Sequence, residues 1–80
     1  MLMNNNSVPP KSIDNVFKHL ESGKPVYITT YTHRTVITKK TLDNFRKAGA
    51  WLLKEEGEGY RMQTGKSSVF IIPGQLKYGD

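Results

Sequence analysis

The chain has 80 residues, 36% of them hydrophobic, with 12 Lys and Arg against 7 Asp and Glu and no cysteine. This length fits one domain with a small core and excludes a large enzyme with separate cofactor and substrate domains. The lack of cysteine excludes disulfides and cysteine-ligated metals and is typical of a reducing compartment, so we expect a cytoplasmic protein. No apolar run is long enough to span a membrane, and residues 1–7 lack the basic and apolar regions of a signal peptide.

Residues 1–10 are predicted to be a disordered N-terminal lead, and residues 11–80 a single α+β domain. The lead is rich in asparagine and ends in two prolines, which cannot enter a helix interior. A helix is predicted after Ser12, a favourable N-cap residue, and it ends before Gly23 and Pro25. Its apolar residues recur at the spacing of one helix face: Ile13, Val16, Phe17 and Leu20.

Residues 26–32 and 35–38 are predicted strands, because they consist almost entirely of β-branched and aromatic residues. The short segment between them allows a hairpin. Alternation along the first strand places Tyr27, Thr29 and Tyr31 on one face.

A second helix is predicted over residues 39–48. Thr38 is its expected N-cap, Ile37 and Leu42 have the spacing of a hydrophobic staple, and Gly49 stands where a helix commonly ends.

Three strands are predicted to complete the domain, at residues 51–55, 60–63 and 68–72. The last is the most apolar and is expected to be central, with Trp51 and Phe70 in the core. Residues 75–80 form either a short edge strand or a frayed end. The predicted fold is a small α+β domain of order α-β-β-α-β-β-β, with an antiparallel sheet packed by two helices.

The net charge of +5 is concentrated around the second helix. Between positions 34 and 47 there are five cations and one anion, Asp43, whereas the rest of the chain is close to neutral. Such a surface favours phosphates, so we expect a non-enzymatic, regulatory nucleic-acid-binding protein without cofactor or metal. The residues expected to contact phosphate are Arg34, Lys39, Lys40, Arg46 and Lys47, and Tyr31 is expected to stack on a base.

Other interpretations remain open. The same basic face can meet an acidic protein surface. Glu55, Glu56 and Glu58 can dock on the basic helix of a second copy, which leaves a homodimer open. The helix and the two strands after it follow the helix-then-wing order of winged-helix proteins, although a strand-rich segment precedes the helix. A small nuclease centred on His33 and Arg34 is the third candidate.

The segment from Tyr60 to Leu76, which ends Ile71-Ile72-Pro73-Gly74-Gln75-Leu76, resembles small orphan proteins of bacteriophages and mobile elements. Its end is similar to the end of a small phage inhibitor of type I CRISPR complexes, an anti-CRISPR protein. The resemblance implies a binding protein that blocks a host defence complex. It covers a strand and its exit turn and brings no catalytic motif.

Overall fold

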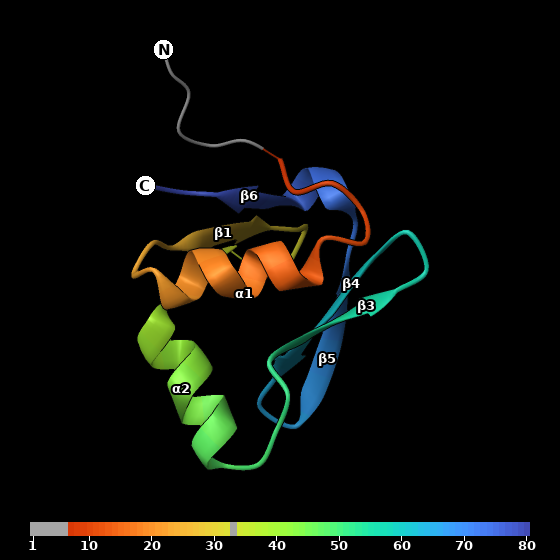
Figure 1. Cartoon of the computed structure of the whole chain (residues 1–80). Coiled ribbons are helices and arrows are strands. Elements are labelled where there is room, and N and C mark those ends of the chain that lie inside the picture. The colour runs from red at the N-terminus through yellow and green to blue at the C-terminus, as the bar shows by residue number, and fades with distance from the viewer. Residues whose placement is uncertain (1–6, 33) are drawn as a thin grey trace.

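The chain forms two α-helices and two three-stranded antiparallel sheets in a computed structural model that describes residues 7–32 and 34–80 (Figure 1). The predicted α+β class and the order α-β-β-α-β-β-β are confirmed, and a sixth strand follows. The elements are α1 (Ile13–Glu21), β1 (Val26–Thr29), β2 (Arg34–Ile37), α2 (Lys39–Lys47), β3 (Leu53–Glu56), β4 (Gly59–Thr64), β5 (Ser67–Ile71), the 3₁₀ helix η1 (Pro73–Gln75) and β6 (Leu76–Tyr78). Neither α-helix of the described chain is long and apolar enough to cross a membrane.

The second helix, α2, is bounded by the local signals that its sequence carries. The side-chain oxygen of Thr38 accepts the backbone N–H of Thr41, and the two threonines form a capping box. The predicted staple residues Ile37 and Leu42 are both buried. At the other end Gly49 has a φ of +72°, a left-handed conformation that glycine adopts without strain.

The start of α1 is capped by side chains from the second sheet, and not by its own N-cap residue. The side chain of Ser12 makes no capping bond, but the backbone N–H of Ile13 donates to Oε2 of Glu55 at 3.1 Å. The backbone N–H of Ser12 donates to the hydroxyl of Tyr60 at 2.8 Å. That hydroxyl donates in turn to the carbonyl oxygen of Pro9 at 3.1 Å. The start of α1 is therefore held against β3 and β4 by hydrogen bonds between residues far apart in the sequence.

The two sheets have the strand orders β2-β1-β6 and β3-β4-β5. The prediction that the apolar strand near residues 68–72 is central is wrong, because β5 lies at an edge and β4 occupies the centre. Consecutive hairpins join β3, β4 and β5, and such a meander puts its middle strand between the other two. The turn at η1 then sends the chain to the first sheet, where β6 pairs with β1. The strands therefore form two sheets, where the sequence predicted one.

Two aromatic residues predicted in the core, Phe70 and Trp51, lie elsewhere, and strand register explains the position of Phe70. In β5, Ile71 points inward and is fully buried, so the preceding Phe70 points outward and is 39% exposed. Phe70 lies opposite Arg61 of β4, whose guanidinium carbon is 5.5 Å from the ring centre. Trp51 is only half-buried, and Nζ of Lys54 lies 4.5 Å from its ring centre.

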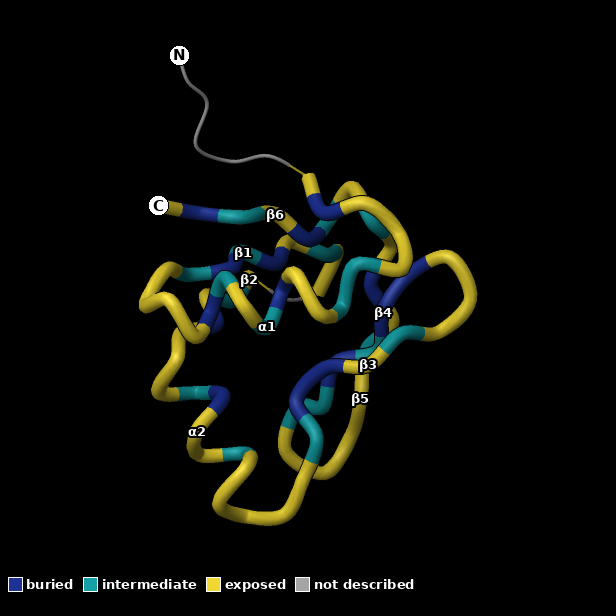
Figure 2. The backbone as a smooth tube through the Cα atoms, viewed as in Figure 1, coloured by how far each residue is buried: buried dark blue, intermediate teal, exposed yellow. Residues whose placement is uncertain are grey.

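Buried side chains from both helices and both sheets form one continuous core (Figure 2). Its members are Val8, Val16, Leu20, Val26, Ile28, Ile37, Leu42, Leu52, Leu53, Tyr60, Met62, Ile71 and Leu76. Tyr60 is the one fully buried aromatic side chain of this cluster, and its hydroxyl has the two partners described above.

The predicted disordered lead is corrected for residues 7–10, whereas residues 1–6 lie outside the described chain. Val8 is fully buried, and its backbone N–H donates to the carbonyl oxygen of Leu76 at 2.9 Å. Ser7 forms an isolated antiparallel bridge with Lys77. Val8 is a single apolar residue among prolines and asparagines, so the sequence around it has no periodic pattern. Its position is determined by the contact with β6.

We expect Val8→Ala to lower the free energy of unfolding by about 2 kcal/mol, because it removes two buried methyl groups and leaves a cavity. The measurement is urea denaturation followed by circular dichroism. The exposed neighbour Ser7 provides the control, since Ser7→Ala should change stability by less than about 0.5 kcal/mol. Equal stability of Val8→Ala and the wild type would contradict the packing of this segment.

Candidate nucleic-acid interface

The outward side of α2 carries the cations that the sequence analysis singled out. Leu42 is buried and Phe45 half-buried, so these two residues direct one side of the helix toward the protein. The four cations of the helix are exposed, two in its first turn and two in its last: Lys39, Lys40, Arg46 and Lys47. The structure therefore presents a basic helix surface, as the 3.6-residue period predicts.

Three of these cations, which we call the lysine set, are Lys39, Lys40 and Lys47. Within the described residues, ion pairs join Arg46 to Glu21 and Arg61 to Glu56, and the lysine set takes part in neither. Lys40 and Lys47 lie two turns apart on the same side of α2, and about 12 Å of helix separates Lys39 from Lys47. Asp43 lies between them and reduces the local positive charge. The surface formed by the lysine set and Asp43 still has a net positive charge and is exposed to solvent.

Arg46 is different, because it already has partners inside the protein. Its guanidinium donates to Oε2 of Glu21 at 2.8 Å, and its guanidinium carbon lies 6.0 Å from the ring centre of Phe17. Both Glu21 and Phe17 belong to α1. Arg46 thus joins the two helices, and we assign it to this contact before any contact with phosphate.

Arg46→Gln should have a small effect on both stability and binding. About half of each side chain of the Arg46–Glu21 pair is exposed, and such surface pairs contribute only about 0–1 kcal/mol. We expect a comparably small loss of unfolding free energy in urea, and a smaller loss of nucleic-acid affinity than for Lys47→Gln. A larger affinity loss for Arg46→Gln would show that Arg46 leaves Glu21 to bind the ligand.

Arg34 and Tyr31 lie apart from the lysine set. Arg34 opens β2 and is exposed, and the three steps from it to Ile37 place it about 10 Å from the end of β2 that precedes α2. Tyr31 is fully exposed and follows the end of β1 at Thr29, so the predicted face of Tyr27, Thr29 and Tyr31 stops before Tyr31. The structure thus separates the predicted site into two parts, one on α2 and one at the β1–β2 hairpin.

His33, the centre of the nuclease hypothesis, lies outside the described residues. Its neighbour Arg34 is exposed at the start of β2. The nuclease interpretation therefore has no described geometry on which to build.

The three glutamates of the β3–β4 hairpin have different roles in the structure. Glu55 caps α1 through the N–H of Ile13. Glu56 accepts hydrogen bonds from Arg61, which lower the pKa of the Glu56 carboxyl and raise the pKa of Arg61. Glu58 is exposed. Two of the three carboxylates proposed for docking on a second copy therefore already have partners within the same chain.

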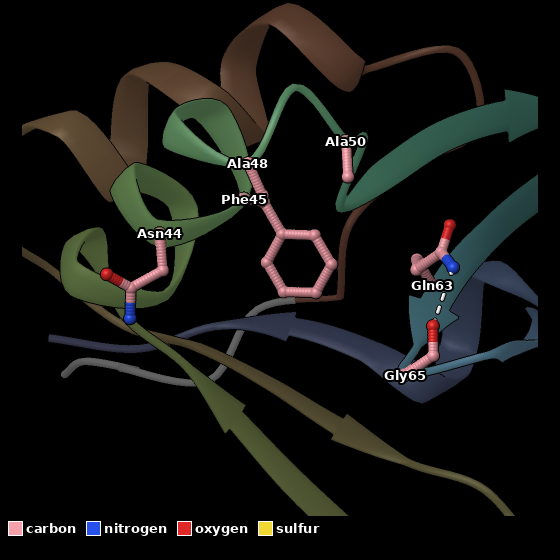
Figure 3. Close-up of a pocket in the computed structure, with 6 residues that line it drawn as sticks. All are labelled: Asn44, Phe45, Ala48, Ala50, Gln63 and Gly65. Carbon is pink, nitrogen blue, oxygen red and sulfur yellow. Dashed lines mark hydrogen bonds between the residues drawn. The ribbon is translucent and has the colours of Figure 1, made fainter.

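A cavity of about 190 Å³ lies between α2 and the β4–β5 turn, and sequence analysis did not find it (Figure 3). Figure 1 shows these two elements projecting in the same direction away from α1. The residues that line the cavity are Asn44, Phe45, Ala48, Ala50, Gln63 and Gly65. They come from segments about 20 residues apart and form no motif, so only their approach in space reveals the site.

The segment that carries the phage resemblance connects the two sheets. Ile71 ends β5 and Leu76 begins β6, and both are buried. Between them the backbone N–H of Ile72 donates to Oε1 of Gln75 at 3.2 Å and stabilises the turn. The residues of the resemblance thus have structural roles.

The chain matches no protein-family model, no curated protein and no solved structure.

Proposed function

We propose that this protein is a non-enzymatic nucleic-acid-binding module that contacts phosphates through α2. The observation that carries the proposal is the lysine set, three exposed ammonium groups on one short helix that enter neither ion pair of the described chain. Neutralising phosphates releases condensed counterions, so such a surface gains affinity from nucleic acid of any sequence.

The position of two of these lysines supports a role in binding. Lys39 and Lys40 occupy the first turn of α2, where the helix dipole disfavours cations by roughly 0.3–1 kcal/mol each. Lys47 in the last turn complements the dipole and needs no ligand to account for it. The two unfavourably placed charges do not stabilise the helix, and a bound anion would offset their cost.

The test is a fluorescence-anisotropy titration of labelled single-stranded and duplex DNA and RNA, repeated over a series of salt concentrations. We expect binding at low salt to weaken as salt rises, with a log–log slope of about −2 to −3 for three to four phosphate contacts on a single strand. Absence of binding to all of these nucleic acids at about 50 mM salt would overturn the proposal.

A protein inhibitor of phage type is the second candidate, and the edge of the first sheet favours it. Within residues 7–32 and 34–80, β2 pairs only with β1 in the order β2-β1-β6, so no described strand covers its other edge. Val36 on this strand is 52% exposed, and Tyr31 in the connection between β1 and β2 is fully exposed. An extended segment of a partner protein can add to such an edge as a further strand.

A pull-down from bacterial lysate, with and without nuclease treatment, distinguishes the two candidates, with the wild type compared with Val36→Lys. A protein captured by the wild type and lost in Val36→Lys supports the inhibitor, because a lysine on an edge strand opposes pairing. Capture that disappears after nuclease treatment supports nucleic-acid binding.

A further inference from the structure

The cavity between α2 and the β4–β5 turn combines the aromatic ring of Phe45 with the amide side chain of Gln63, whereas the amide of Asn44 points away from both (Figure 3). In Figure 3 the ring of Phe45 points from α2 into the space between the helix and the turn. Asn44 lines the cavity from the helix and Gln63 from β4. Its volume of about 190 Å³ is below the roughly 300–1,000 Å³ of pockets for drug-sized ligands. The space therefore fits one flat ring system.

Backbone and side-chain hydrogen bonds hold the walls of this cavity in place. The backbone N–H of Ala50 donates to the carbonyl of Phe45 at 2.9 Å and closes the end of α2. Across the cavity, Nε2 of Gln63 donates to the carbonyl of Gly65 at 2.7 Å, which leaves the amide oxygen as an acceptor for a ligand. Gly65 turns the chain with a φ of +62°. The cavity is thus formed before any ligand enters.

Exposed cations are close in the chain to residues that line this cavity on both of its walls. Lys40 precedes Asn44 by four residues and Lys47 follows it by three, so all three lie on one side of α2. Lys66 follows Gly65 on the opposite wall and is exposed. The residues that line the cavity include no carboxylate. A strand with one base in the cavity would therefore have a lysine available to its phosphates on each of the two walls, Lys47 on α2 and Lys66 on the turn.

We propose that this cavity receives one nucleobase of a single-stranded nucleic acid. The base packs against the ring of Phe45, its polar edge meets the amide of Gln63, and the adjoining phosphates reach Lys47 and Lys66. A base inside a duplex is stacked and paired, so only an unpaired base can enter without the cost of flipping. This inference rests on the proposed function and names the substrate class of the same site.

The test compares a single strand of about 12 nucleotides with a strand of equal length that lacks the bases. Both present the same phosphates, so their difference in affinity reports the base alone. We expect the wild type to bind the base-bearing strand about tenfold to hundredfold more tightly. Phe45→Leu and Gln63→Leu should remove most of this difference, whereas binding of the baseless strand and its salt dependence should not change.

Each outcome bears on one of the two proposals. Equal binding of both strands by the wild type overturns the base cavity and leaves the phosphate contacts of α2 intact. Failure to bind either strand overturns the proposed function itself. Retained discrimination in both variants also overturns the base cavity. If Phe45→Leu does not fold, as judged by circular dichroism, Gln63→Leu provides a variant at a residue outside the core cluster.

Discussion

A variant with Lys39, Lys40 and Lys47 all replaced by glutamate should bind a single strand roughly 100-fold more weakly than the wild type at about 50 mM salt. The substitutions remove three ammonium groups that bind phosphate and put like charges beside the strand. The log–log salt slope should become shallower by about 2, since each phosphate bound accounts for about 0.7 of the slope. All three side chains are exposed, so the fold should be retained, and anisotropy titrations over a salt series measure both quantities.

The control for this variant replaces Lys11, Lys18 and Lys24 by glutamate, which changes the net charge by the same amount. These three lysines are also exposed, but they lie on and beside α1. We expect a much smaller decrease in affinity, because the ammonium groups of α2 act on the strand at close range, whereas distant charges are screened by salt. An equal decrease in the two variants would mean that net charge alone attracts the strand, and the assignment to α2 would be wrong.

Tyr60→Phe should lower the free energy of unfolding by about 2–4 kcal/mol, although it removes a single oxygen atom. That oxygen accepts the N–H of Ser12 and donates to the carbonyl of Pro9. Each partner left without a hydrogen bond away from water costs about 1–3 kcal/mol. Urea denaturation measures the loss. Tyr31→Phe is the matched control, because Tyr31 is fully exposed and its change should stay within about 0.5 kcal/mol.

Because of the Tyr60 hydroxyl, the free energy of unfolding should depend on pH in the alkaline range. Burial raises the pKa of Tyr60 above its ordinary value of 10.0. The unfolded chain therefore loses this proton at lower pH than the folded one, and stability falls as the pH rises above about 10. Burial also raises the pKa of Tyr78, so Tyr60→Phe should reduce this dependence without abolishing it. An unchanged alkaline dependence in Tyr60→Phe would contradict the assignment.

Local sequence signals predicted α2 well, because its determinants lie within a few residues, whereas the start of α1 is capped by residues distant in the sequence, Glu55 and Tyr60. Thr38 and Gly49 bound α2 through its own capping box and its own left-handed turn. The exposed cations of α2 follow from the same period, since burying Leu42 leaves the lysines outside. The basic part of the candidate site was therefore accessible from sequence alone.

Pairing between distant segments could not be predicted in the same way. Val8 is buried because β6 lies beside it, and Phe70 is exposed because its register with Arg61 turns it outward. The cavity near Phe45 exists because the β4–β5 turn comes to face α2. Each of these features depends on which strands meet and in what register. A register shift of one residue exchanges the two faces of a strand, and the register cannot be predicted from the amino-acid composition of the strand.

The sequence by itself determined the α+β class, the order of the elements and the concentration of positive charge on α2. These depend on side-chain periodicity, caps and residue counts, which act over one or two helical turns. The tertiary structure decided that there are two sheets, that Arg46 pairs with Glu21 and that a cavity opens beside the lysine set. These depend on contacts between segments far apart in the chain, whose geometry is set only when the whole core packs.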